Sequence, residues 1–490
     1  MLGVERYARI RTAARDPVLV ALAGLVVVAA ALRFSTLDLQ SYYTDEAYTV
    51  WLVKQSPIDM VHGIVRTEST PPLYYSVAWV WSRLFGTGEV GLRSLSALAG
   101  TATVLVAFLA GSQLLSRRAG LVVAALAAVS PFMVWYSQEA RSYALYTLLA
   151  TLSIYLYARL RREPRPALVV AWAAVCEASI WTHYFAVYLV ATEAALLLLL
   201  VPRARRAVAA ALGAVALASL PVAWLAILQH RRGNPEWIAQ LALGNRLRSA
   251  SEEFIGGHYQ MAHPRVVVAL LAILVVGLVA GARSRAVRPR MAEAALLGIG
   301  VVGLPLVAAA LGKDYWLSRN VMPAWLCAAL VVGVGVAGMQ RQWLTWLFAA
   351  ALVLLALAPT VRTFQRAEFQ RKNWRGVARC LGPQRRERAL VLRSEAAALV
   401  LGIYRPDTAR LGGKAKLVDD VDVVDLPPSN LHMPTQFAGA GTSCARTIPV
   451  ERFTAKKPTR VSASDFLAPS RESDAEVRLD QPTDVAAAKG

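Results

Sequence analysis

The sequence predicts an all-α polytopic membrane protein, and three observations support this fold class. Of the 490 residues, 56% are hydrophobic and only 17% are charged, a smaller share of charge than a soluble protein carries. Uncharged windows of about 17–23 residues recur, which is the length that a helix needs to cross roughly 30 Å of hydrocarbon. The arginines fall in short clusters between these windows. Together these features exclude a soluble globular enzyme.

The charge distribution also excludes a nucleic-acid partner, although the net charge is +21. Short basic clusters between apolar runs are typical of loops that face anionic lipid on the cytoplasmic side of a membrane. The first window follows four arginines without a small-residue cleavage site, so we interpret it as an uncleaved anchor. Those arginines are Arg6, Arg9, Arg11 and Arg15.

Eleven apolar windows predict about eleven transmembrane helices. These windows cover residues 17–34, 93–115, 119–136, 142–158, 166–182, 184–201, 207–228, 264–282, 291–311, 320–338 and 343–361.

The basic turns predict the orientation of these helices in the plasma membrane. If the basic N-terminus is cytoplasmic, the alternate turns 116–120, 158–166, 202–206, 281–290 and 339–342 are cytoplasmic too, and every one is basic. The opposite turns then lie on the extracytoplasmic face. They hold most of the candidate site residues, which are Asp45, Glu139, Arg141, His183, Tyr184 and Arg319.

The first external loop is expected over about residues 36–92. Within it, residues 71–86 are apolar but short, with Trp79, Trp81 and Arg83 interleaved. A span here would reverse the charge bias of the turns that follow. We therefore expect interfacial helices in this loop, where Trp and Tyr are common.

The composition changes after residue 361, where the transmembrane domain 1–361 ends. Residues 362–460 are polar and alternate in the manner of a small α/β domain, which we expect outside the cell. Residues 461–490 have the composition of a disordered tail. Cys380 and Cys444 both fall in the C-terminal part and pair if that compartment is oxidising.

Asp45 and Glu46 are the first candidates for catalysis. They stand side by side among tyrosines, directly after the first apolar window. A solvated loop pair is the plain alternative, and metal binding is a third, although no His lies at ligand spacing. A carboxylate at the membrane interface suits a base that takes a proton from an incoming hydroxyl.

Several further residues on the same face are candidates for substrate binding. Arg141 either snorkels to the headgroups or clamps a lipid-linked phosphate, with Glu139 orienting its guanidinium. His183 and its neighbour Tyr184 lie in a tight turn, where the plain alternative is an interfacial His bonded to a carbonyl. Arg93 and Arg319 enter spans from the outer face, as substrate contacts or as anchors.

Four segments together resemble bacterial membrane glycosyltransferases of the GT-C class. The similarity is to the protein O-mannosyltransferase and aminoarabinose transferase group, often called glycosyltransferase family 39-like. It extends over about residues 40–200 and is fainter over 314–325 and 373–381. The segments are "TDEAY" (44–48), 70–100, 117–150 and "THYFAVYLV" (182–190).

The resemblance implies many transmembrane helices and a sugar donor linked through phosphate to a polyprenol. Asp45 matches the acidic residue taken as the catalytic base, with Glu46 beside it, and Arg141 becomes a donor-phosphate contact. Many relatives have a His before the Pro-Pro pair, whereas this chain has Thr70 there. Any role built on that His does not transfer to this chain.

The resulting hypothesis is transfer of a sugar from a polyprenyl-phosphate donor to an acceptor hydroxyl on the extracytoplasmic face, with inversion. The main alternative is a flippase or transporter of a lipid-linked sugar, which would place charges along a path through the spans. A non-catalytic sensor is a third reading. The sugar stays open, and so does the acceptor, which is a protein, a glycan or a lipid. The pattern fits chemistry with a divalent metal or without one.

Overall fold

The computed structural model describes residues 16–233, 236–258, 263–382, 387–425, 431–443, 448–467 and 475–480. The chain divides into two compact units, which are described separately. The helical unit contains residues 1–37 and 52–369, and the sheet unit contains residues 38–51 and 370–490. The basic residues Arg6, Arg9, Arg11 and Arg15 lie outside the described residues, as does Cys444.

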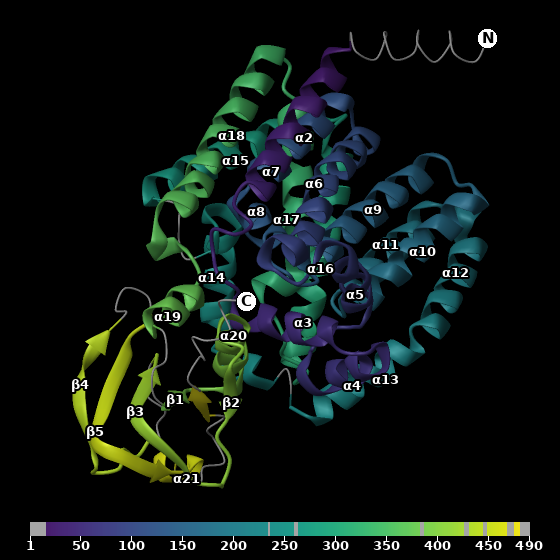
Figure 1. The fold of residues 1–490 in the computed structure, drawn as a ribbon. Coiled ribbons are helices and arrows are strands. Elements are labelled where there is room, and N and C mark those ends of the chain that lie inside the picture. The colour runs from purple at the N-terminus through teal and green to yellow at the C-terminus, as the bar shows by residue number, and fades with distance from the viewer. Residues whose placement is uncertain are drawn as a thin grey trace, which may run out of the picture. The chain divides into compact units, whose positions relative to one another are not determined.

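The helical unit is a bundle in which α6 and α17 occupy the centre (Figure 1). α6 packs against α2, α7 and α9, and α17 packs against α7, α15 and α16. The helices within the expected apolar windows include α2 (Pro17–Phe34), α6 (Glu89–Leu114), α7 (Arg117–Val129), α9 (Tyr143–Arg162), α10 (Pro166–Thr182), α11 (Ala186–Leu200), α12 (Arg205–Ala218), α15 (Pro264–Arg283), α16 (Arg288–Ala310), α17 (Met322–Ala337) and α18 (Gln342–Gln365).

Further helical segments complete the unit. They are α4 (Pro57–Thr67), α5 (Leu73–Phe85), α8 (Pro131–Ser137), α13 (Leu220–Arg231), α14 (Leu243–Gly256) and the 3₁₀ turns Pro202–Ala204, Glu236–Ile238, Ser318–Val321 and Ala367–Phe369.

Six helices of the described chain are long and apolar enough to cross a membrane, or eight if two bent helix pairs each count as one span. The expected count of eleven is therefore not confirmed, although every expected window contains helix. The differences have local causes. α10 has only 17 residues, and the last turn of α9 carries Arg159, Arg161 and Arg162. Window 207–228 is interrupted at Ser219, between α12 and α13.

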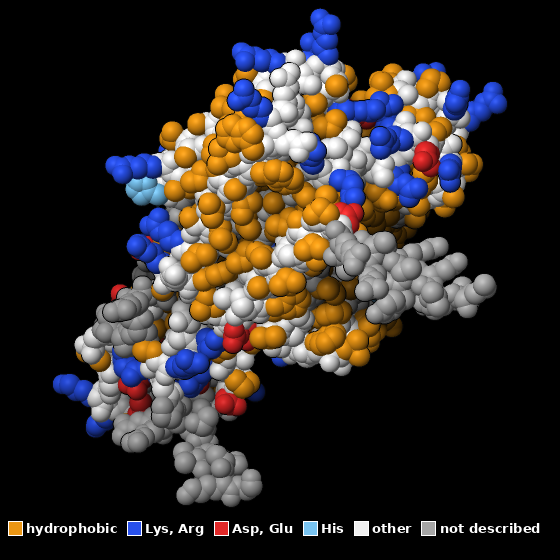
Figure 2. All heavy atoms as spheres, turned by 90° about the horizontal axis from the view of Figure 1, so that it is seen from above, with side chains coloured by type: hydrophobic (Ala, Val, Ile, Leu, Met, Phe, Trp, Pro, Cys, Tyr) orange, Lys and Arg blue, Asp and Glu red, His pale blue; other side chains and the backbone are white. Residues whose placement is uncertain are grey.

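The burial of these helices separates an inner layer from an outer one. In the most apolar stretch, 67% of α6 is buried, against 17% of α2 and 17% of α15. Val27 on α2, Val268 on α15 and Leu354 on α18 are all exposed. Figure 2 shows hydrophobic side chains over much of one face, with Lys and Arg mainly around them. An apolar surface of this extent requires lipid rather than water.

The pair α7 and α8 bends by 60° at Ser130 and Pro131. Pro131 has no N–H to continue the helix. Arg33 of α2 compensates for the break: its guanidinium donates to Ala127 O at 2.8 Å and to Ala128 O at 2.9 Å. Because lipid offers no hydrogen bonds, these freed carbonyls need such a donor inside the protein.

The helices of the first loop are too short to span a membrane. α4 has 11 residues and α5 has 13. This agrees with the expectation that residues 71–86 form a helix that does not cross. Its position at the membrane interface stays a prediction.

The sheet unit contains one six-stranded sheet in the order β2-β6-β1-β3-β5-β4. β1 and β3 pair in parallel, and the other neighbours pair antiparallel. α3, which begins in this unit, comes first along the chain. The elements are α3 (Thr44–Lys54), α19 (Trp374–Cys380), β1 (Arg388–Leu392), α20 (Glu395–Tyr404), β2 (Thr408–Arg410), β3 (Lys416–Val424), β4 (Phe437–Ser443), β5 (Val450–Val461), α21 (Ala463–Phe466) and β6 (Glu476–Asp480).

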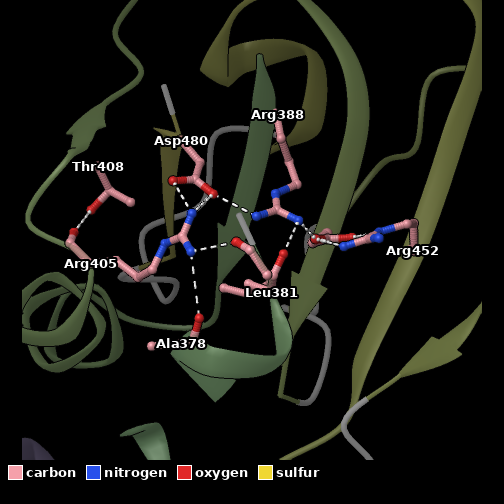
Figure 3. A network of polar contacts seen from close by, with 9 residues as sticks. Ala378, Leu381, Arg388, Arg405, Thr408, Arg452 and Asp480 are labelled. Atoms are coloured by element: carbon pink, nitrogen blue, oxygen red, sulfur yellow. Dashed lines mark hydrogen bonds and ion pairs between the residues drawn. The ribbon is translucent and has the colours of Figure 1, made fainter. Parts of the chain in front are cut away.

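A buried charge network joins the central strands of this sheet (Figure 3). Arg388 of β1 contacts Asp480 of β6 at 2.6 Å and Asp422 of β3 at 2.9 Å. Arg405 also binds Asp480, at 2.6 Å, and Arg452 of β5 binds Asp422 at 2.8 Å. Buried ion pairs of this kind add little net stability but penalise any mispaired arrangement strongly. The network bridges the four adjacent strands β6, β1, β3 and β5.

The expectation of a disordered tail over 461–490 is wrong for its first part. β5 extends to Val461, α21 follows, and β6 pairs with both β1 and β2. Strand β6 is held by its pairing with β1 and β2 and by the Arg388–Asp480 contact. Neither interaction can be predicted from the amino-acid composition of the segment. Cys380 is disulfide-bonded, and Cys176 and Cys327 are free.

A glycine substitution tests how tightly the α7–α8 bend is packed. A Cβ at Gly100 of α6 would lie 2.0 Å from Ser137 Oγ and 3.0 Å from Arg33 Nε. We expect Gly100→Ala to lower the free energy of unfolding by about 1–3 kcal/mol, because Ser137 is already bonded to Arg33. The measurement is thermal unfolding in lipid nanodiscs. Gly213→Ala in α12, where a Cβ meets nothing within 4 Å, is the control and should melt at or above the wild-type temperature. Equal melting temperatures for the two variants would contradict the packing argument.

Candidate functional site

The loop that follows α8 carries two of the predicted site residues, Glu139 and Arg141. Gln138 fixes its start, because its side-chain amide donates to Leu32 O at 3.1 Å and to Arg33 O at 3.0 Å. Both Glu139 and Arg141 are buried. The sequence "YSQEARSY" therefore forms a packed turn, held by the C-terminal end of α2, rather than a solvated loop.

Arg141 forms a two-point ion pair with Glu68. Its Nη1 donates to Glu68 Oε1 at 3.0 Å and its Nη2 donates to Oε2 at 2.7 Å. The side chains are only 9% and 2% exposed, respectively. From the sequence, Glu139 is the residue expected to orient this guanidinium, and Glu68 is not predicted to do so. Glu68 directly precedes the "STPP" segment, but no local sequence pattern connects it with Arg141.

Glu68 also connects Arg141 to the segment that departs from the glycosyltransferase pattern. The Tyr75 hydroxyl donates to Glu68 Oε2 at 2.6 Å and lies 2.9 Å from the Thr70 hydroxyl. The Arg141 guanidinium lies 5.8 Å from the centre of the Tyr75 ring. Thr70 is thus one member of a buried polar cluster of Glu68, Thr70, Tyr75 and Arg141.

His183 lies in the turn between α10 and α11, where it is buried. Its ring stacks on Tyr146 with the centroids 4.6 Å apart, and its Nδ1 accepts the N–H of Phe185 at 3.3 Å. Burial, together with the positive charges of Arg319 and Arg141, lowers the pKa of His183 to about 3. The imidazole is therefore neutral at physiological pH and is suited to hydrogen bonding rather than to binding phosphate as a cation.

Arg319 is half-buried within the 3₁₀ turn that precedes α17. Its guanidinium lies 5.7 Å from the ring centre of Tyr143 and 5.6 Å from that of Trp237. Tyr143 also faces His183, at a centroid distance of 6.0 Å. Arg319 and His183 therefore both lie beside Tyr143, and the charge of Arg141 is near enough to lower the pKa of His183. Their common role at one site stays a prediction.

A carboxylate that the sequence analysis missed lies beside this group. Glu253 of α14 accepts the Ser318 hydroxyl, next to Arg319, and its Oε1 lies 3.4 Å from His258 Nδ1. His258 stacks on Trp135 of α8 at 5.0 Å. The sequence carried no motif around Glu253.

Tyr184 and Arg93 make contacts that hold the first loop. The Tyr184 hydroxyl donates to Gln229 Oε1 at 2.9 Å, and the Gln229 amide donates to Ile64 O and Thr70 O at 3.1 and 3.3 Å. Arg93 is buried and donates to Leu37 O at 2.8 Å. These contacts position the loop, and they support the anchoring role that was one alternative for Arg93.

Asp45 and Glu46 belong to the sheet unit, in the first turn of α3. They differ in burial: Asp45 is half-buried, whereas Glu46 is fully buried. Glu46 Oε2 accepts the N–H of Tyr43 at 3.0 Å, so this carboxylate caps the start of its own helix. Of the two, Asp45 has the side chain that solvent reaches.

Among the residues that the structure describes, no group of three or more His, Cys, Asp or Glu side chains is arranged to hold a metal ion. The buried carboxylate of Glu68 is instead paired with Arg141.

Comparison with known proteins identifies the class of this architecture. Residues 69–227 match the family model of "Dolichyl-phosphate-mannose-protein mannosyltransferase". The structure of ArnT from Cupriavidus metallidurans bound to undecaprenyl phosphate matches 88% of this chain and 97% of that chain, with 14% identity and a TM-score of 0.54. This chain resembles GT-C glycosyltransferases and has the fold of ArnT. It is a multi-pass membrane protein, and the resemblance expected from its sequence is confirmed.

Two further solved structures are similar to this chain. ArnT in the apo state gives a TM-score of 0.56, again with 14% identity and with 88% and 97% coverage of this chain and that chain. An Archaeoglobus fulgidus oligosaccharyltransferase gives a TM-score of 0.49 with 13% identity, covering 73% of this chain and 54% of that one. The chain thus spans about half the length of the archaeal protein. A search of curated proteins finds no significant match.

One matched pair of substitutions tests the burial of the Arg141 ion pair. We expect Glu68→Gln to lower the free energy of unfolding by about 3–5 kcal/mol, because it leaves a buried guanidinium without its counter-charge. Glu163→Gln, which breaks an exposed pair with Arg165 at 3.1 Å, should cost less than about 1 kcal/mol. Thermal unfolding of both variants in nanodiscs makes the comparison. A Glu68 variant as stable as the Glu163 variant would show that Arg141 is not held by this pair.

Proposed function

We propose that this chain is a glycosyltransferase that moves a sugar from a polyprenyl-phosphate donor to an acceptor hydroxyl. The observation that carries the proposal is the family match over residues 69–227 together with the ArnT fold. ArnT has been solved with undecaprenyl phosphate bound, which is the carrier that such a donor leaves behind. The mannosyltransferase name of the matched family makes a mannosyl-type donor the first to test.

The chemistry requires no nucleotide, because a phosphate on the anomeric carbon is already a good leaving group. Asp45 is the proposed base: it takes the proton of the acceptor hydroxyl as the oxygen attacks the anomeric carbon. The bond from that carbon to the phosphate oxygen breaks in the same step, and polyprenyl phosphate leaves. A single displacement of this kind inverts the anomeric centre.

The departing phosphate needs cations, and Arg141 and Arg319 are the proposed ones. Glu68 holds the guanidinium of Arg141 in place through its two Nη atoms. The guanidinium of Arg319 lies over the rings of Tyr143 and Trp237. Glu139, His183 and Tyr184 are proposed to shape the same pocket, and Arg93 is proposed to anchor it. Glu46 supports the helix that bears Asp45.

The proposed site faces the extracytoplasmic side of the plasma membrane, with the N-terminus in the cytoplasm. The basic turns between the helices support this orientation. The acceptor is then a hydroxyl on a protein, a glycan or a lipid of the cell envelope.

The decisive experiment supplies purified protein in nanodiscs with a panel of polyprenyl-phosphate sugars, mannose first, and measures free polyprenyl phosphate. We expect acceptor-dependent release by the wild type and a loss of at least about 100-fold in kcat for Asp45→Asn, since that variant has no base. Asp38→Asn, an exposed aspartate of the same segment, is the control and should keep full activity. A flippase leaves the sugar–phosphate bond intact, so movement of donor without release would refute the proposal. Full activity of the Asp45 variant would refute the assignment of the base.

A further inference from the structure

The segment that carries Asp45 is held within the sheet unit by hydrogen bonds to residues more than 300 positions later in the chain. Residues 38–51 and residues 370–490 form one compact unit. Asp45 is the second residue of α3, which begins at Thr44. The position of its carboxylate therefore depends on how residues 40–43 are fixed.

The first anchor is the chain just before α19. The N–H of Arg371 donates to Gln40 Oε1 at 2.8 Å. The Ser41 hydroxyl donates to Lys372 O at 2.9 Å and accepts the N–H of Trp374 at 2.9 Å. Ser41 thus uses its hydroxyl both as donor and as acceptor, and it is itself buried.

The second anchor is the last residue of α20. The N–H of Tyr42 donates to the Tyr404 hydroxyl at 2.6 Å, and Tyr42 is 1% exposed. The next residue, Tyr43, provides the first backbone acceptor of α3, because the N–H of Ala47 donates to Tyr43 O at 3.0 Å. Only one residue, Tyr43, separates the Tyr404 contact from the beginning of the helix.

We infer that Tyr404 and Ser41 are positioning residues for Asp45 and that the C-terminal sheet domain serves catalysis by holding the base. This inference rests on the proposed function. A helix start that is bonded on consecutive residues has little freedom to tilt, and a shift of about 1 Å in a reacting group costs up to about 100-fold in rate. Because neither residue is proposed to touch the substrate, their loss should change the rate of the chemical step and not the binding of the donor.

The test compares Tyr404→Phe and Ser41→Ala with the full-length wild type in nanodiscs. Each variant removes a hydroxyl and keeps the rest of the side chain. Tyr155→Phe, a half-buried tyrosine of α9, is the matched control, and Ser41→Thr restores a hydroxyl. Two quantities are measured: kcat and KM for donor hydrolysis or transfer, and amide hydrogen exchange over residues 38–48.

We expect kcat to fall about tenfold in both variants with KM for the donor unchanged, and exchange over 38–48 to accelerate at least about tenfold. The control and Ser41→Thr should behave as the wild type. Faster exchange with unchanged kcat would overturn the positioning role, and so would unchanged exchange. A rise in KM equal to the fall in kcat would indicate general disruption and also overturn it. If the wild type itself transfers no sugar, the proposed function is refuted. That result differs from a loss of activity in the variants alone, which concerns only the positioning role.

Discussion

The contact between Arg33 and the last carbonyls of α7 is the constraint on which the helical unit depends. A helix that breaks inside a bilayer exposes carbonyl groups that lipid cannot bond. Here Pro131 makes the break, and Arg33 supplies the donors to Ala127 O and Ala128 O. Ser137, at the far end of α8, accepts from the same guanidinium at 3.1 Å. The bend is therefore a fixed corner, and the turn that bears Arg141 follows directly from it.

Polar contacts connect the turn after α8 with the first loop. Arg141 bonds to Glu68, Glu68 to Tyr75, and Gln229 connects the loop backbone to Tyr184. The Arg141–Glu68 and Tyr184–Gln229 contacts join residues 73 and 45 positions apart in the sequence, and each pairs groups that would be costly to bury alone. This pairing supports the proposed role of the site, because electrostatic stabilisation of a departing phosphate requires donors that are already in place.

The sequence predicted what depends on local pattern. Apolar windows locate the helices because every backbone group in lipid must bond within its own segment, and the resemblance to GT-C enzymes rests on ordered local motifs. The number of spans was not predictable, because Pro131 and Ser219 interrupt windows that look continuous in composition. The Glu68–Arg141 pair joins residues 73 positions apart, and strand β6 is polar. Both are products of tertiary pairing, which a single sequence does not display.

The place of β6 within the sheet has a consequence for biosynthesis. This strand, made from residues 476–480, lies between β1 and β2 rather than at an edge. A ribosome must therefore release the chain up to residue 480 before the sheet can close, long after residues 38–51 of the same unit have been translated. Residues 38–51 therefore lack their contacts with residues 370–480 while the intervening helices are synthesised and inserted into the membrane. The sheet unit is complete only when residues 38–51 are joined by the segment that begins at residue 370.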